Sequence, residues 1–114
     1  MKAVCTMALV AVVACGTSAD APIRVVRQQS PAGVRLTLVA NPAVQINAQL
    51  KPALELKDGS ILRFDAAGIS ADSAYFTVPP ELLLPAGVPA RGKIRASVCD
   101  SGESVCRLVM IALK

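Results

Sequence analysis

Apolar and polar residues alternate with a period close to two over much of residues 23–113, which is typical of half-buried β-strands. Segment 34–39 (VRLTLV) follows the alternation well, because Val34, Leu36 and Leu38 fall on one face. Turn-forming residues interrupt the pattern about every 8–12 residues, and this spacing favours an antiparallel β-sandwich of about seven strands. We therefore expect one all-β domain over residues 23–114.

The expected strands are short runs of alternating or β-branched residues between turn signals. They lie at 23–27, 34–39, 54–57, 60–64, within 71–78 (centred on 75–77), and at 93–98 and 105–113. The dipeptide Asp58-Gly59 predicts a hairpin with a tight type I′ turn. Segment 44–47 is short and ambiguous, and the prolines between 79 and 91 predict a loop or a short helical turn.

The chain begins with the features of an export signal. One charged residue, Lys2, precedes an uncharged apolar run at 3–14, which has the length of a signal-peptide apolar region. A spanning helix needs about 20 apolar residues, so this run is too short, and no later stretch is long enough. The run ends in the residues VVAC at 12–15, which look like a bacterial lipobox. In signals of that type the chain is cut before the cysteine, and the thiol carries a diacylglycerol.

The lipobox resemblance implies a lipoprotein whose membrane partner is reached through a lipid on Cys15. Its parts would be a signal peptide at 1–14, a flexible tether at 15–22 and the folded domain at 23–114. Gly16, rather than aspartate, follows the cysteine, and similar lipoproteins are usually passed to the outer membrane. We therefore expect an outer-membrane lipoprotein facing the periplasm, since two acyl chains suffice for stable anchoring. The alternative is an ordinary secretory signal cut after Ala19.

Charge and composition argue against several functions. The net charge is +4, but the Lys and Arg residues form no run, and the only aromatic residues are Phe64, Tyr75 and Phe76. A nucleic-acid partner is therefore not expected. The chain has no histidine, which removes the usual general base of a Ser or Cys hydrolase and a common zinc ligand. We expect no metal and no other cofactor.

Cys99 and Cys106 are the only thiols that remain if Cys5 leaves with the signal and Cys15 is lipidated. A two-residue loop at 102–103 would place them opposite each other in a C-terminal hairpin. The same register matches two apolar pairs on the other face of that hairpin, Ala96 with Val109 and Ile94 with Ile111.

This register predicts a hydrogen-bonded cysteine pair, whose Cβ atoms would lie about 4.5–5.5 Å apart, wider than the ~3.8 Å of a relaxed disulfide. A bond there would be strained and more easily reduced. Two roles stay open: a structural staple, which an oxidising periplasm favours, and a redox pair. Asp100 and Glu103 would raise a thiol pKa, whereas Arg95 or Arg107 would lower it.

The closing stretch at 92–106, with GKIRASVC ending at Cys99 and VC at Cys106, resembles the periplasmic amino-terminal domain of DsbD-type thiol:disulfide interchange proteins. The resemblance implies an immunoglobulin-like sandwich in which Cys99 and Cys106 relay reducing equivalents to periplasmic partners. The family's cysteines are typically closer together, with an aromatic residue near the second, where this chain has Arg107-Leu108.

The leading interpretation is a membrane-anchored, non-catalytic binding or accessory domain of immunoglobulin-like fold with a structural Cys99–Cys106 disulfide. The absence of a polar catalytic constellation in the sequence favours it. The alternative is an enzyme, a thiol:disulfide oxidoreductase, that uses the same two cysteines as its catalytic pair. A periplasmic protein partner fits either role.

Overall fold

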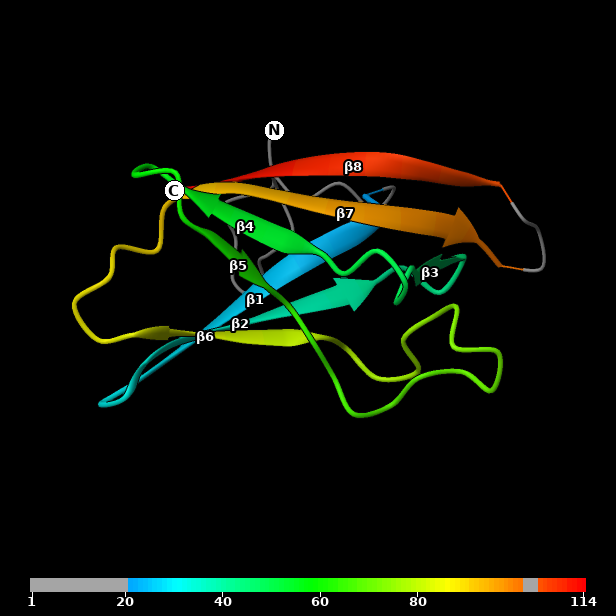
Figure 1. Ribbon diagram of the computed structural model, residues 1–114, viewed down its shortest axis with the longest axis horizontal. Coiled ribbons are helices and arrows are strands. Elements are labelled where there is room, and N and C mark those ends of the chain that lie inside the picture. Colours follow the sequence, from blue (N-terminus) through cyan, green and yellow to red (C-terminus); the bar gives the residue numbers. More distant parts are fainter. Residues whose placement is uncertain (1–20, 102–104) are drawn as a thin grey trace, which may run out of the picture.

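The computed structural model describes residues 21–101 and 105–114, which form eight strands (Figure 1). The strands are β1 (Ile23–Ser30), β2 (Gly33–Ala40), β3 (Val44–Ile46), β4 (Ala53–Leu56), β5 (Ile61–Arg63), β6 (Glu81–Pro85), β7 (Gly92–Asp100) and β8 (Cys106–Leu113). These described residues contain no helix, and therefore none that could cross a membrane. The expected signal peptide at 1–14 and most of the expected tether, with Cys15, lie outside them.

The strands pair into two antiparallel sheets. One sheet has the order β1-β2-β6, with β2 in the middle. The other is built around β7, which pairs along one edge with β8 and along the other edge with β3 and β4 in turn. β5 extends this second sheet beyond β4. The expectation of an all-β, antiparallel domain is confirmed.

The two sheets share one hydrophobic core. Leu36 and Leu84 come from the three-stranded sheet, Leu54 and Ile94 come from the other sheet, and all four are fully buried. Phe64, which directly follows β5, is also fully buried in the same cluster. Burial of such side chains contributes roughly 1.5–3 kcal/mol each, so the alternation of the sequence translates directly into the packing that holds the sheets together.

The end of β4 and the start of β7 approach so closely that residue 92 must be glycine. A Cβ on Gly92 would lie 2.1 Å from the backbone carbonyl oxygen of Glu55. The backbone φ of Gly92 is +150°, a conformation that residues with a side chain rarely adopt.

The hairpin between β4 and β5 is confirmed, but its turn is not the predicted type I′. The backbone N–H of Leu56 donates to the carbonyl of Ser60 (2.8 Å), which leaves residues 57–59 in the loop. Among these three residues only Gly59 has a positive φ, of 92°, whereas a type I′ turn needs two such residues. The loop is therefore one residue longer than expected, with glycine in the left-handed position.

The predicted strand at 71–78 is wrong, because the segment makes only isolated bridges. The carboxylate of Asp72 accepts hydrogen bonds from the Ser70 hydroxyl (2.6 Å) and from the Ala74 backbone N–H (3.1 Å). Ser73, between them, has a positive φ of 61°. These local bonds hold the chain in a turn, so the β-propensity of residues 75–77 is not realised as a strand.

The predicted loop at 79–91 is wrong over its middle, because Glu81–Pro85 forms β6. This strand pairs only with β2, so it lies at an edge of its sheet. Proline is tolerated at edge strands and strand ends, which reconciles the strand with Pro80 before it and Pro85 at its last position. The ambiguous segment 44–47 is also a strand over Val44–Ile46.

Candidate functional site

The two cysteines predicted to face each other form a disulfide between β7 and β8 (S–S 2.05 Å). The predicted register is confirmed, because Cys99 is paired with Cys106 in the ladder. The apolar pairs that supported this register are also present, Ala96 with Val109 and Ile94 with Ile111. The loop residues 102–104, which include Glu103, lie outside the described part of the chain.

The expectation of a wide, hydrogen-bonded cysteine pair is wrong. The backbone N–H of Asp100 donates to the carbonyl of Val105 (3.0 Å), so the adjacent pair Cys99–Cys106 is a non-hydrogen-bonded one. Its Cα atoms are 3.9 Å apart, closer than in a hydrogen-bonded pair. A two-residue loop would have made Cys99 and Cys106 a hydrogen-bonded pair, and the strain was predicted from the wider spacing of such a pair. The prediction of an easily reduced bond therefore loses its basis.

The surroundings of the two sulfur atoms differ. Cys99 is 1% exposed on the central strand β7, whereas Cys106 is exposed on the edge strand β8. Beside them, the guanidinium of Arg107 donates to the carboxylate of Asp100 (3.0 Å). Asp100 was expected to raise a thiol pKa and Arg107 to lower it. Because these two side chains form an ion pair, their charges offset each other.

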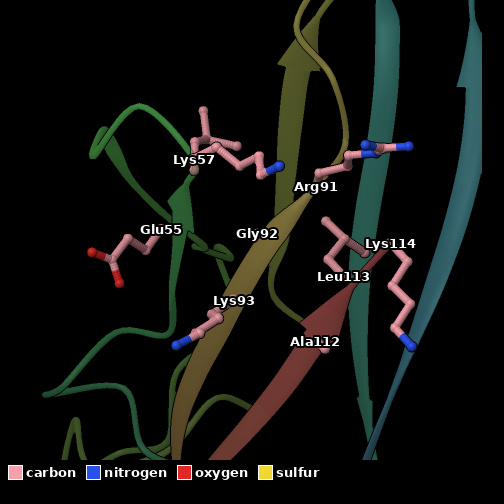
Figure 2. Close-up of a pocket in the computed structure, with 9 residues that line it drawn as sticks. Glu55, Lys57, Arg91, Gly92, Lys93, Ala112, Leu113 and Lys114 are labelled. Carbon is pink, nitrogen blue, oxygen red and sulfur yellow. The ribbon is translucent and has the colours of Figure 1, made fainter.

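A second feature, a hollow of about 660 Å³, lies where β4, β7 and β8 meet (Figure 2). Leu56 pairs with Gly92 across β4 and β7, and Gly92 pairs with Leu113 across β7 and β8. The end of β4, the start of β7 and the end of β8 therefore lie side by side, and the residues next to these strand ends line the hollow. We call this hollow the cationic pocket, because four of its lining residues are basic: Lys57, Arg91, Lys93 and Lys114.

The basic side chains of the cationic pocket have no partner among the described ion pairs. Those pairs involve other residues, namely Arg35 with Glu81, Lys51 with Asp65 and Arg107 with Asp100. Glu55 is the pocket's only acidic lining residue, and it is paired with Lys93 across β4 and β7. In Figure 2 Glu55 and Lys93 extend to one side of the pocket, whereas Arg91 and Lys114 extend to the other.

An adjoining hollow of about 500 Å³ shares three residues, Leu56, Lys57 and Arg91, with the cationic pocket. Val88, Pro89 and Asp58 line the rest of it. The Ser60 backbone N–H donates to Asp58 (2.8 Å) and holds the pKa of that carboxyl below its ordinary value. The adjoining hollow thus combines apolar walls with a carboxylate that is ionised at neutral pH.

The cationic pocket and the disulfide lie at opposite ends of β7. Seven residue steps of about 3.3 Å separate Gly92 from Cys99, which amounts to about 23 Å along the strand. Near the disulfide, Ser101 donates to the carbonyl of Ala43 (3.0 Å), and Asn41 donates to that of Pro22 (2.8 Å). The described chain therefore begins at the disulfide end.

Sequence reasoning found the cysteine pair but missed the cationic pocket. The basic residues form no run in the sequence, because Lys57, Arg91, Lys93 and Lys114 belong to three separate stretches. The sequence feature that could have revealed the pocket is the position of these residues, since each lies within two residues of the first or last residue of a strand. Among the described residues no three His, Cys, Asp or Glu side chains cluster as metal ligands would.

No family model matches the chain, no curated protein matches it, and no solved structure matches it.

Proposed function

We propose that the chain is an exported lipoprotein, held on a membrane by a lipid on Cys15, whose domain is a non-catalytic binding module. The Cys99–Cys106 disulfide is the observation that carries this proposal. Disulfides persist in oxidising compartments such as the periplasm and are rare in the cytosol. The bond therefore agrees with the apolar run at 3–14 and with the VVAC sequence at 12–15, which look like a lipoprotein signal. Gly16 favours the outer membrane as the destination.

The proposed fold is an immunoglobulin-like β-sandwich. Two sheets with the orders β1-β2-β6 and β8-β7-β4-β5 share one core, which supports a sandwich. β3 and β4 pair with the same edge of β7, so they can be regarded as one strand interrupted at residues 47–52. Counted in this way the domain has seven strands, the number in the simplest immunoglobulin-like domains.

Lipid labelling of the full chain tests the anchoring. The chain is expressed in a bacterium that processes lipoproteins, supplied with an alkyne-bearing fatty acid, and analysed by mass spectrometry of its N-terminal peptide. We expect label on the wild type and on the matched variant Cys5→Ala, and none on Cys15→Ala. An unlabelled protein that begins at Asp20, after a cut behind Ala19, would overturn the proposed anchor.

Thiol–disulfide exchange is a second candidate, favoured by the exposure of Cys106. A partner's thiolate would attack the sulfur of Cys106, form a mixed disulfide and release Cys99 as a thiolate. A second partner thiol would then resolve the mixed disulfide and leave this domain as a dithiol and the partner as a disulfide. The resemblance of residues 92–106 to DsbD-type domains supports the same role for the pair.

The reduction potential of the disulfide separates the two roles. A structural staple is expected below about −300 mV, whereas an exchange partner is expected nearer −200 mV. Cys99→Ala leaves the exposed thiol of Cys106 and would trap mixed disulfides if exchange occurs, whereas Cys106→Ala leaves only the buried thiol as its control. A low potential without trapped adducts supports the structural role.

A further inference from the structure

We propose that the cationic pocket binds a ligand carrying a phosphate group with at least two negative charges. This inference rests on the proposed binding role and names the site and the ligand class for it. The four basic residues of the pocket are brought together by pairing of strands that are distant in sequence. Exposed cations that line one hollow attract anions and raise their local concentration there.

Backbone contacts join the segments at the base of the cationic pocket. Leu113 is buried, and Gly92 allows β4 and β7 to approach each other closely. The guanidinium of Arg27, on β1, donates to the backbone carbonyl of Ala90 (3.3 Å) and to a backbone oxygen of Lys114. Arg27 therefore joins the two segments that carry Arg91 and Lys114, which limits the relative movement of the backbones that position these two cations.

The side chains match phosphate better than a single carboxylate. Arg91 offers a planar guanidinium that can bind two phosphate oxygens at once, and Lys57 and Lys114 add mobile point charges. Glu55 and Lys93 are cross-strand neighbours of opposite charge that extend away from Arg91 and Lys114, which leaves these three cations to act on the ligand. An anion with two or more charges neutralises them best.

The size of the two hollows indicates a small molecule. A volume of about 660 Å³ lies within the range of ligand pockets, which hold molecules of drug size. The adjoining hollow has apolar walls at Leu56, Val88 and Pro89, so it can receive a less polar part of the same ligand. Asp58, which also lines it, would repel a second anionic group there and so favour a ligand whose phosphate lies toward Arg91.

The position of the pocket favours a free ligand over a headgroup of the anchoring membrane. The described chain begins beside Asn41 at the disulfide end, and the pocket lies at the opposite end of β7. A domain tethered through Cys15 would therefore present the pocket away from the membrane that holds it. Phosphate chemistry is shared by both sources, and the probes below distinguish them.

The test uses the full chain in neutral detergent micelles, with backbone amide shifts followed by NMR. The probes are inorganic pyrophosphate, citrate, short-chain phosphatidic acid, whose phosphomonoester can carry two charges, and short-chain phosphatidylcholine. Saturable shifts at residues 55–57, 91–93 and 112–114 with pyrophosphate support the proposal and a free ligand. Saturation with phosphatidic acid alone supports the proposal with a lipid headgroup as the source. No saturation with either, or citrate binding as tightly as pyrophosphate, overturns it.

Two matched double variants test the assignment to this site. Lys57→Gln with Arg91→Gln should weaken pyrophosphate binding by about tenfold or more, because charge-assisted hydrogen bonds are lost. Arg24→Gln with Arg63→Gln removes the same charge from residues outside both hollows and should leave binding unchanged. Equal weakening of pyrophosphate binding by the two double variants would overturn the assignment of binding to the cationic pocket. Labelling at Cys15 is measured separately, so failure of the pocket and failure of the anchor are distinguishable.

Discussion

Cys99 and Cys106 belong to one bond but occupy different environments. Cys99 is buried on β7, which is paired with β3 and with β8 at this position, whereas Cys106 is exposed on the edge strand β8. A disulfide of this kind joins the sheet's edge strand to its centre at the end where the described chain begins. Its contribution to stability comes chiefly from the restriction of the unfolded chain.

Removal of the disulfide tests that contribution. We expect Cys99→Ala with Cys106→Ala to lower the free energy of unfolding by about 2.5 kcal/mol, the chain-entropy value for a loop of this length. The measurement is urea unfolding of the oxidised wild type and the variant under identical conditions. A matched loss on chemical reduction of the wild type is the control. A loss below about 0.5 kcal/mol would contradict a stapling role.

Lys51 and Asp65 form an exposed ion pair, with 2.8 Å between the ammonium nitrogen and a carboxylate oxygen. The hydrogen bond from Lys51 is the main cause that holds the pKa of Asp65 below its ordinary value. We expect Lys51→Met to raise the pKa of Asp65 toward that value, as followed by NMR titration of the carboxyl carbon. Asp72, whose pKa is lowered chiefly by Ser70, should titrate unchanged. Movement of both would contradict the assignment.

At the scale of elements, most strands could be predicted because they alternate. Segment 34–39 is a clear case, and β2 indeed buries Leu36 and Leu38 on one face. β6 could not be predicted in this way, because three successive leucines between prolines show no period of two. Its pairing with β2, a long-range contact, decides the structure there. At 71–78 a strand was predicted but is not formed, because hydrogen bonds to the Asp72 carboxylate hold the chain in a turn despite its strand propensity.

The close approach of β4 and β7 predicts a severe effect of one methyl group. Gly92→Ala would place Cβ against the Glu55 carbonyl oxygen, a backbone atom that cannot move without separating the strands. We expect a loss of about 3 kcal/mol or more in the free energy of unfolding, measured by thermal and urea unfolding.

Gly87→Ala is the matched control for that variant. Gly87 also has a positive φ, of 93°, but no atom lies within 4 Å of the position its Cβ would occupy. We expect a cost of about 1–2 kcal/mol, the usual cost of a left-handed residue with a side chain. Equal losses in the two variants would show that strand approach plays no part.

At the scale of the molecule, the candidate sites differ in how far the sequence could predict them. The cysteine pair follows from local spacing within one hairpin, so register alone locates it. The cationic pocket requires the relative placement of β4, β7 and β8, which no local pattern contains. Arg27, which fastens the pocket from the other sheet, is 87 residues from its acceptor Lys114.

Acid should destabilise the whole domain through its exposed turns. Asp58, Asp65 and Asp72 each have a folded-state pKa below the ordinary value of 3.8. A lowered folded pKa stabilises the fold above the unfolded pKa, and this stabilisation is lost as the pH falls through the folded value. We expect urea midpoints to be level near neutral pH and to fall below about pH 4. Replacing all three with Asn should flatten that fall; an unchanged slope would contradict it.

The pairing of β7 with three strands has a consequence for the order in which the chain can fold. Ribosomes deliver residues from the amino terminus, and β3 can complete its ladder only after residues 98–100 have been made. β1 with β2, and β4 with β5, are local hairpins that can form early. The second sheet, by contrast, closes when the last hairpin arrives. The second sheet can therefore be completed only after β7 and β8 have been synthesised. A polypeptide that stops before Gly92 lacks β7, the strand with which β3, β4 and β8 pair.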